Sequence, residues 1–386
     1  MFVHDQRLPH VLPPTAYHDR DHFRRELNAV LKPFWHIVGT LSDLAVPGDF
    51  LTLDIAGEAV QIRNFDGKLT ALSNTCAHRH CLLTSLARGR SPSMRCQYHG
   101  WEYQCDGRTG RIPEPKNFMP FDREQFQLPR YHVERLGQLV FVSIAENPIS
   151  LRSQLGEEFA GVIEERFGSD WQPTFAWRPE YPANWKVPIE NSLEAYHVPA
   201  VHPNSFRVDP GESRSDHELH PNRTALKTKL PFSTDTRSDI AFHKVENVMQ
   251  RLLGYRVTDD YSQHHVFPNL LFSFTDSISL CHCVMPIDAS HSCGIVRQFG
   301  KRPKPGRGWL RPAARVWNIV EALVTKQILK EDLGIFASIQ AGLERSSCTP
   351  ETLGRRRATL RVSVICTATV RNRRVCGNTV EGGAVE

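Results

Sequence analysis

The spacing of apolar residues changes along the chain and predicts segments of different secondary structure. Residues 19–32 carry apolar positions at helical spacing and are predicted to form an amphipathic helix. From about residue 38 the pattern becomes that of short strands, and residues 50–55 alternate between apolar and polar positions. Asp66-Gly67 separates two such runs and predicts a tight hairpin turn. We therefore expect one helix followed by a β-rich segment.

The β-rich pattern stops near residue 147 and a mixed pattern replaces it. Residues 139–144 form the last strand-like run, and Asn147-Pro148 indicates a boundary. Residues 170–310 mix helical and strand patterns, and residues 313–344 form a long helical pattern. The predicted parts are an N-terminal helical segment (1–37), a β-rich domain (38–147), a mixed domain (148–345) and a tail (346–386).

Composition and charge narrow the class of protein. The chain has 386 residues, of which 40% are hydrophobic and 23% charged, as in an ordinary globular protein. Its net charge of +5 would suit a nucleic-acid-binding protein. Residues 345–386 nevertheless hold eight arginines, no lysine and three acids, which account for the whole excess. The remaining body is neutral and offers no electrostatic footprint for nucleic acid.

The sequence gives no sign of export. No apolar stretch follows the first residues, and no run of about 18 apolar residues occurs, so we expect neither a secretory signal nor a membrane span. We therefore expect a cytoplasmic protein. Its ten cysteines are expected to be metal ligands or free thiols rather than a disulfide framework.

Two pairs of Cys and His lie close together in the β-rich segment. Cys76 and His78 form a C-x-H pair, and Cys96 and His99 form a C-x-x-H pair. Thiolates and imidazoles together suit a soft or borderline metal. A structural zinc site is one interpretation. A Rieske [2Fe–2S] cluster, in which two Cys hold one iron and two His the other, is the second. The second is favoured because each pair combines one Cys with one His.

A further group of possible ligands lies near residue 190. Residues 184–197 are interpreted as a run in which a helix starts near Pro188, a residue that is tolerated in a first turn. One face of that helix would carry Glu190, Glu194 and His197. Pro199 is expected to break the helix and to bring His202 to the same point as His197. Two histidines and one carboxylate would form the ligand triad of a non-haem Fe(II) oxygenase. The alternative is a set of surface acids with ordinary histidines.

The long C-terminal helical pattern supplies a candidate third ligand, Asp332. Helical spacing puts this residue in the middle of an apolar stripe made of Ile328, Leu329, Ile335, Phe336 and Ile339. Lys330 and Glu331 are expected to face outward. A buried, unpaired carboxylate is costly, so a metal or another cation is expected beside Asp332. The alternatives are an aspartate that caps a loop or pairs with an arginine.

Over about residues 35–345 the chain resembles the oxygenase α subunit of Rieske non-haem iron oxygenases. This superfamily includes aromatic-ring-hydroxylating dioxygenases and choline-, glycine betaine- and carnitine-type monooxygenases. Residues 76–79 resemble the family's C-x-H-R loop, and residues 96–103 resemble its C-x-x-H-G-W-x-Y loop. His80 and Gln97 depart from the usual residues, both at positions that are not ligands. Many ring-hydroxylating dioxygenases have Asp at the position of Glu194, so the run around this residue resembles the monooxygenase branch more closely.

The resemblance implies an α+β fold. It implies a β-rich Rieske iron–sulfur domain and a catalytic domain with an antiparallel sheet flanked by helices. The implied ligands of the [2Fe–2S] cluster are Cys76, His78, Cys96 and His99. The implied ligands of a mononuclear Fe(II) are His197, His202 and Asp332. Glu194 is implied to bridge His197 to His99 of a neighbouring subunit.

The same resemblance implies an activity and partners. An oxygenase of this kind activates O2 and hydroxylates or oxidatively dealkylates a small organic substrate, here a quaternary ammonium compound or an aromatic acid. Its electrons come from NAD(P)H through a flavin- and iron–sulfur-containing reductase, in some cases with a ferredoxin. The subunits are expected to form a homotrimer or a multiple of it. An aromatic cage for a quaternary ammonium could be built from Trp171, Trp177, Trp185 and Tyr196.

Two other classes of function stay open on sequence alone. One is a zinc-stabilised nucleic-acid-binding protein, suggested by the Cys/His pairs and the arginine-rich tail. The other is a Rieske electron carrier without oxygenase chemistry. The tail itself, residues 346–386, matches the family least. It is expected to be solvated or disordered, with a docking segment for a reductase or the product of an altered reading frame as alternatives.

Overall fold

The computed structural model describes residues 12–120, 122–195, 197–202, 205, 214–231 and 237–346. The arginine-rich tail beyond Ser346 and Tyr196 therefore lie outside the described residues. The described chain forms two compact units. The small unit is residues 31–153, and the large unit combines residues 12–30 with residues 154–346. Among the described residues, no helix is long and apolar enough to cross a membrane.

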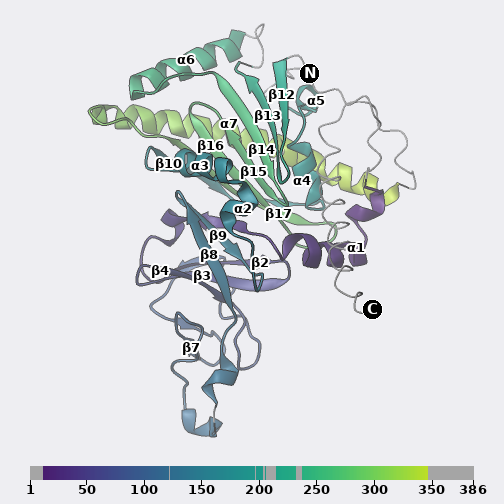
Figure 1. The fold of residues 1–386 in the computed structure, drawn as a ribbon, viewed down its shortest axis with the longest axis vertical. Helices are drawn as coiled ribbons and strands as arrows, with labels where there is room; N and C mark the ends of the chain where they lie inside the picture. The colour runs from purple at the N-terminus through teal and green to yellow at the C-terminus, as the bar shows by residue number, and fades with distance from the viewer. Residues whose placement is uncertain are drawn as a thin grey trace, which may run out of the picture. The chain divides into compact units, whose positions relative to one another are not determined.

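The small unit is built on an antiparallel sheet. Its strands follow the order β1 (His36–Thr40), β9 (Leu139–Ser143), β8 (Arg130–Leu136), β4 (Lys68–Ser73), β3 (Glu58–Phe65), β2 (Asp49–Ile55) and β5 (Arg88–Arg90) (Figure 1). A separate small hairpin joins β6 (Met94–Arg95) to β7 (Glu102–Tyr103). Three 3-10 helices complete the unit: η3 (Leu41–Leu44), η4 (Pro115–Phe118) and η5 (Arg123–Phe126).

The predicted hairpin between β3 and β4 is confirmed. Phe65 pairs with Lys68, and Asp66 and Gly67 have φ angles of 49° and 93°. Two successive positive φ angles are typical of the type I′ turn that Asp-Gly favours. Below this sheet, an apolar cluster that includes Leu83, Met94 and Trp101 packs under the β6–β7 hairpin. The small unit thus holds its two Cys/His loops on a packed core.

The large unit has a second antiparallel sheet. Its strands follow the order β10 (Trp171–Trp177), β17 (Ser292–Lys301), β16 (Ile278–Pro286), β15 (Leu270–Phe274), β14 (Asp260–Val266), β13 (Arg223–Lys229) and β12 (Ser215–Leu219), and β11 (Glu180–Tyr181) also pairs with β17. Burial of both faces explains the near-continuous apolar runs of β15 and β16.

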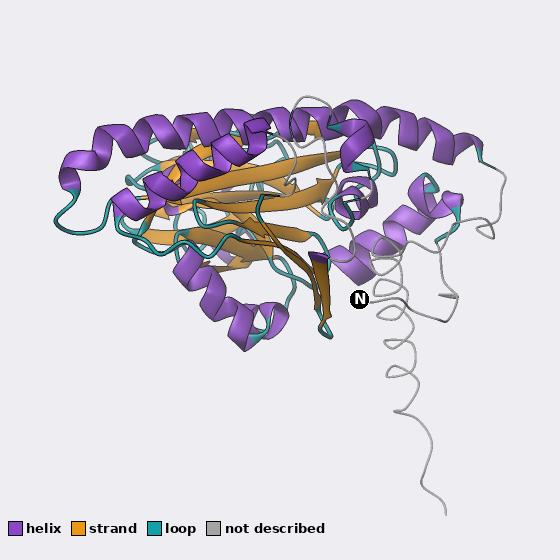
Figure 2. Ribbon diagram, turned by 90° about the horizontal axis from the view of Figure 1, so that it is seen from above, coloured by secondary structure: helices purple, strands orange, loops and turns teal. Residues whose placement is uncertain are grey.

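Helices surround this second sheet. The long helix α7 (Arg311–Arg345) runs across one face, as Figure 2 shows. Helix α6 (Arg237–Leu253) contacts α7 where the rings of Phe242 and Trp317 lie 5.2 Å apart. The shorter helices are η1 (Pro14–Tyr17), α1 (Arg20–Glu26), η2 (Leu27–Leu31), α2 (Leu151–Leu155), α3 (Glu157–Arg166), α4 (Lys186–Asn191), α5 (Val198–Val201) and η7 (Gly308–Leu310). The expected α+β class, with a β-rich domain and a helix-flanked antiparallel sheet, is confirmed.

Candidate metal centres and the adjoining cavity

The first Cys/His pair lies after β4 and the second lies in the turn of the β6–β7 hairpin. The N–H of Cys96 donates to the carbonyl of Trp101 at 2.8 Å, and the N–H of Gly100 donates back to the carbonyl of Cys96 at 3.0 Å. Gly100 has a φ of 72°, and a Cβ there would lie 2.7 Å from the Arg95 guanidinium. The glycine is therefore required for the turn that presents His99.

These loops bring the four expected cluster ligands into one region. The rings of His78 and His99 have centroids 4.8 Å apart, and the indole of Trp101 stacks on His78 at 4.6 Å. Cys76 and Cys96 are 2% and 3% exposed. Burial raises the pKa of the Cys76 thiol, which also lies close to Cys96. Two buried thiols and two half-buried imidazoles therefore meet in one region of the small unit.

Two hydrogen-bonding details fit a metal cluster at this place. Nδ1 of His78 is buried and has no hydrogen-bond partner among the described residues, as expected for a nitrogen that serves as a ligand. The Tyr103 hydroxyl accepts from the N–H of Ala77 at 3.0 Å, which leaves its proton for the Cys76 sulfur at 3.1 Å. A hydrogen bond to a ligating sulfur is one way in which proteins tune an iron–sulfur cluster. The sequence motif contains Tyr103, but its spacing alone did not reveal this contact.

At the second centre, the predicted helix that starts near Pro188 and continues to His197 is wrong beyond Asn191. Helix α4 ends at Asn191, and the chain turns before the one-turn helix α5. The Ser192 hydroxyl donates to the Pro188 carbonyl at 2.9 Å, a local bond that competes with continuation of the helix. Pro199 lies in the first turn of α5 and does not break it, because the missing N–H is not needed there. His197 and His202 are the two caps of α5.

This geometry brings His197, His202 and Asp332 together. One ligand atom from each lies within 4.8 Å of the other two. Nε2 of His202 lies 3.1 Å from Oδ1 of Asp332, and Nε2 of His197 lies 3.5 Å from the same oxygen. The two Nε2 atoms are 3.3 Å apart. The donor set is that of a two-histidine, one-carboxylate iron site.

A carboxylate holds the far nitrogen of each histidine. Oε1 of Glu194 lies 2.6 Å from Nδ1 of His197, and Oε2 of Glu331 lies 3.0 Å from Nδ1 of His202. Such partners fix the proton on Nδ1 and leave Nε2 with a lone pair for a metal. Two lone pairs and the Asp332 carboxylate would then face one point, which a cation would stabilise.

Glu331 was expected to face outward, and that expectation is wrong. Its side chain is 8% exposed. The Ser205 hydroxyl donates to Oε2 of Glu331 at 2.6 Å, and the Gln327 amide donates to Oε1 at 2.9 Å. These donors, together with His202, hold the side chain against the helix edge. Asn191 similarly donates to Oδ1 of Asp332 at 2.9 Å, from a position that the sequence did not single out.

The electrostatics of the group follow from these contacts. Burial acts to raise the pKa of Asp332, but the hydrogen bonds from His197 and His202 outweigh burial and lower that pKa to about 2. Burial acts to lower the pKa of His197, but its bonds to Asp332 and Glu194 raise it to about 9. Both shifts have the same cause, because the carboxylate and the two imidazoles stabilise one another's charged forms.

Glu190 does not join this group, although it was expected on the same helix face. It accepts from the Tyr17 hydroxyl at 2.6 Å, and burial raises its pKa to about 7. Beside it, the fully buried Lys186 ammonium lies 2.8 Å from both carboxylate oxygens of Glu26. The N-terminal helix α1 thereby anchors helix α4, which precedes the metal group.

A cavity of about 730 Å³ adjoins the three metal-site residues. Its lining is largely apolar and includes Leu226, Phe242, Leu271, Ile278, Leu280 and Ile328. Trp171, Trp177 and Trp185, expected as parts of an aromatic cage, are not among the described lining residues. The described lining contains no Lys or Arg, whereas it contains Glu194, Asp239, Glu246 and Glu321 besides Asp332. The cavity therefore suits an apolar molecule with a positive charge.

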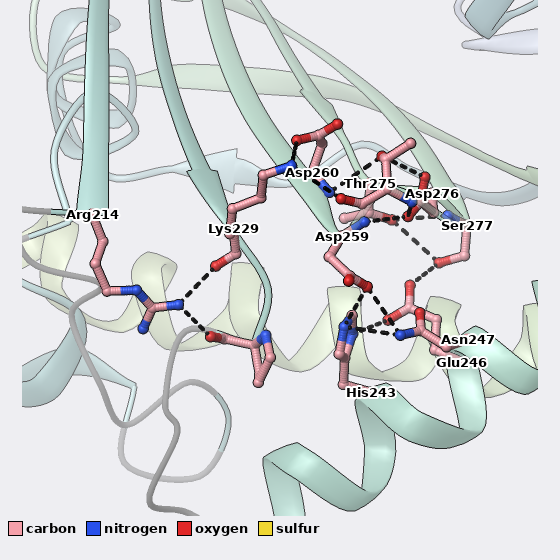
Figure 3. Close-up of polar contacts among 12 residues, drawn as sticks. Arg214, Lys229, His243, Glu246, Asn247, Asp259, Asp260, Thr275, Asp276 and Ser277 are labelled. Carbon is pink, nitrogen blue, oxygen red and sulfur yellow. Dashed lines mark hydrogen bonds and ion pairs between the residues drawn. The ribbon is translucent and has the colours of Figure 1, made fainter. Parts of the chain in front are cut away.

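A polar network lies at the α6 side of this cavity (Figure 3). His243 lies between Glu246, at 3.2 Å from Nδ1, and Asp259, at 2.8 Å from Nε2. Asn247 donates to Asp259 at 2.9 Å, and the Ser277 hydroxyl donates to Glu246. No sequence motif predicts this network, because its members come from α6, from the segment between α6 and β14, and from the turn between β15 and β16.

The two units also match known protein families. Residues 34–132 match the family of Rieske [2Fe–2S] domains. Residues 168–360 match the catalytic domain of the ring-hydroxylating alpha subunit. Both metal centres described above thus fall within matched domains.

Several curated proteins are similar in sequence. The carnitine monooxygenase oxygenase subunit of Escherichia coli (strain K12) is 31% identical over 243 residues, which cover 60% of this chain and 64% of that protein. The glycine betaine monooxygenase oxygenase subunit of Pseudomonas aeruginosa (strain UCBPP-PA14) is 29% identical, over 51% of this chain and 46% of that protein. The similarity thus spans less than two thirds of the length of these relatives.

Solved structures share the fold. A quaternary ammonium Rieske monooxygenase in complex with L-carnitine has a TM-score of 0.66 at 22% identity, and the likeness covers 93% of this chain and 94% of that one. Naphthalene 1,2-dioxygenase from Rhodococcus sp. bound to indole has a TM-score of 0.68 at 15% identity, with 93% of each chain covered.

Proposed function

The chain belongs to the family of ring-hydroxylating alpha subunits, with a Rieske domain before the catalytic domain, and we propose that it is the terminal oxygenase component of an O2-dependent oxygenase. The observation that carries the proposal is the His197–His202–Asp332 group at the wall of a cavity, in a chain that also holds the four residues of a Cys₂His₂ cluster site. A Rieske electron carrier needs the cluster site but neither the second group nor the cavity. A zinc-stabilised nucleic-acid-binding protein likewise needs neither the His197–His202–Asp332 group nor the cavity.

In the small unit, Cys76 and Cys96 would hold one iron of a [2Fe–2S] cluster, and His78 and His99 the other. The unpartnered Nδ1 of His78 and the buried thiols support this assignment. In the large unit, His197, His202 and Asp332 would hold a mononuclear Fe(II). When bound, the cluster supplies single electrons and the mononuclear iron supplies O2 activation.

The protein's own residues have separate tasks in this scheme. Glu194 and Glu331 orient the two imidazoles and keep their protons on Nδ1. Asn191 fixes one carboxylate oxygen of Asp332. The apolar lining holds the substrate next to the metal group and excludes bulk water. Glu194 would also bridge His197 to His99 of a neighbouring subunit in a homotrimer.

The substrate of the proposed reaction is a small organic molecule that is hydroxylated or oxidatively dealkylated. Acidic residues without a described Lys or Arg in the cavity lining favour a cationic substrate over an aromatic acid. The sequence relatives named for carnitine and glycine betaine are consistent with a cation. The electrons would come from NAD(P)H through a flavin- and iron–sulfur-containing reductase, with or without a ferredoxin, in the cytoplasm.

Metal analysis and spectroscopy of the purified protein test this function. The proposal predicts three irons and two acid-labile sulfides per chain, two irons in the cluster and one at the mononuclear site. It also predicts a Rieske EPR signal after reduction and incorporation of ¹⁸O from ¹⁸O2 into a product. A colourless protein that contains only zinc would refute the proposal. Two irons per chain with an intact Rieske signal would instead identify an electron carrier.

A further inference from the structure

Two carboxyl groups lie at the end of the cavity away from the metal group. Glu246 comes from α6 and Glu321 from α7, and both line the cavity although they are only 6% and 2% exposed. Glu321 and Asp332 are eleven positions apart in α7, so their backbone positions lie about 16 Å apart along the helix axis. The cavity therefore has one acidic end at the metal group and a second acidic end at Glu246 and Glu321.

The protein itself satisfies Glu246. The Ser277 hydroxyl donates to its Oε1, and Nδ1 of His243 lies 3.2 Å from its Oε2 (Figure 3). The hydrogen bond to Glu246 raises the pKa of His243. Asp259 faces the other nitrogen of the same imidazole at 2.8 Å. The His243 ring thus lies between two carboxylates.

Among the described residues, only one oxygen of Glu321 has a hydrogen-bond donor. Its Oε1 accepts from the indole N–H of Trp317 at 2.6 Å. Its Oε2 is buried and has no hydrogen-bond partner among the described residues. A buried polar atom without a partner is destabilising, and such atoms are rare in folded proteins. An acceptor that lines a cavity and lacks a donor points to a ligand that supplies one.

The charges around Glu321 indicate the sign of that ligand. Burial raises the pKa of Glu321, the nearby Ser277 hydroxyl, which donates to Glu246, acts to lower it, and the negative charge of Glu246 raises it further, so that the pKa is about 8. Among the described groups that line this end, Asp239, Glu246 and Glu321 are acidic, and His243 is the basic group. A positive charge placed here would stabilise the ionised form of Glu321 and offset the repulsion from Glu246.

We propose that Glu321 and Glu246 form a subsite for a protonated amine, in which an ammonium N–H donates to Oε2 of Glu321. The inference rests on the proposed oxygenase function and specifies its substrate. That substrate carries an ammonium group with at least one N–H at the end remote from the carbon that reacts. Glu321 is the specificity-determining residue, and Glu246 contributes charge.

The hydrogen-bond donor separates this ligand from a quaternary ammonium ion. A quaternary nitrogen has no N–H and would leave Oε2 of Glu321 without a partner. Quaternary ions are instead bound by several aromatic faces. Among the described lining residues, Phe242 and Tyr261 are the only Phe, Tyr or Trp side chains. The lining thus offers a carboxylate acceptor more clearly than it offers an aromatic cage.

Calorimetric titration of the iron-loaded protein at pH 7 tests the subsite. The probes are 4-phenylbutylamine, its N,N,N-trimethyl derivative and the neutral 4-phenylbutan-1-ol. The amine is expected to bind at least about tenfold more tightly than either of the other two, because it alone is both charged and a donor. In Glu321→Gln this preference should disappear. Glu246→Gln, which retains the Glu321 acceptor, should weaken amine binding by a smaller factor.

Glu344→Gln is the matched control, since Glu344 is on the same helix but does not line the cavity. This variant should retain the full preference for the amine. Equal iron content and equal melting temperature in all variants establish that each has folded. Binding of the trimethyl derivative as tightly as the amine would overturn the proposal. An unchanged preference in Glu321→Gln, or no binding of the amine to the wild-type protein, would also overturn it.

The outcomes separate this proposal from the oxygenase function. If the protein lacks the mononuclear iron or any ¹⁸O2-dependent product, yet binds the amine through Glu321, the subsite stands and the function is wrong. If the protein turns over with O2 but Glu321→Gln binds the amine as the wild type does, the function stands and the subsite is wrong.

Discussion

Replacement of Glu331 by glutamine is the sharpest test of how the mononuclear site is held. Glutamine has nearly the same shape, so the substitution removes the negative charge without opening a cavity. In the wild-type protein, Oε2 of Glu331 lies 3.0 Å from Nδ1 of His202 and accepts from Ser205 at 2.6 Å. We expect Glu331→Gln to weaken Fe(II) binding while the fold and the cluster in the small unit remain intact.

The size of the effect follows from the geometry. Hydrogen bonds accepted by a carboxylate are stronger than those accepted by an amide oxygen, and they raise the basicity of the ligating imidazole that donates them. Loss of such a partner typically lowers metal affinity by about 10- to 100-fold, or roughly 1.4–2.7 kcal/mol. We expect the lower half of this range, because the amide oxygen of glutamine can still accept from Nδ1–H. Asp332 and His197 continue to hold the ion.

The assay is a competition between the protein and an Fe(II) chelator under anaerobic conditions. The visible spectrum of the Rieske cluster counts folded chains in the same sample, so loss of mononuclear iron is measured per intact molecule. Glu344→Gln serves as the control on the same helix. A dissociation constant within twofold of the wild-type value would refute the role of Glu331. Parallel loss of the Rieske spectrum would show that the substitution unfolds the protein instead.

Three further predictions address the other sites. Asp332→Ala should lower the iron content from three to two per chain and spare the Rieske EPR signal, and retention of all three irons would contradict the ligand assignment. Tyr103→Phe removes the hydrogen bond to the Cys76 sulfur, which in the wild type stabilises the reduced cluster, and should therefore lower the Rieske midpoint potential by roughly 50–100 mV. An EPR-monitored redox titration measures the potential, and an unchanged value would exclude this role of Tyr103. Glu321→Gln should become more stable relative to the wild type as pH rises from 5 to 8. The unfolded chain releases this proton near pH 4.5 and the folded protein near pH 8, so the wild type loses up to about 1.4 kcal/mol per pH unit between them. Denaturant titrations at three pH values measure the difference in free energy of unfolding between Glu321→Gln and the wild type. A difference that stays constant with pH would contradict the prediction.

Local features of the sequence predicted the small unit well. The Asp66-Gly67 turn and the short loops around Cys76 and Cys96 depend on residues that are neighbours in the chain. Helical periodicity also placed Asp332 on the inner side of a long helix, where the structure brings it to the two histidines. In each case the deciding interactions lie within a few residues or a few helical turns.

Features that depend on distant segments could not be predicted. Helix α4 ends at Asn191 because side chains near it bond to the backbone and to Asp332, 141 residues away. Glu331 turns inward because Ser205 and His202 supply donors across more than 120 residues. The pairing of Glu246 with Glu321 joins two helices that show no common motif. Helical periodicity contains none of this information.

The buried Lys186–Glu26 pair constrains how the protein is made. Glu26 precedes the small unit in the chain, and Lys186 follows it 160 residues later. During synthesis the small unit can therefore emerge and fold before Lys186, the ion-pair partner of Glu26, has been made. A fragment that begins after residue 153 would lack Glu26, and loss of one partner from a buried ion pair costs about 3–5 kcal/mol. The small unit is in this sense an insertion, and any truncated catalytic fragment must retain residues 12–30.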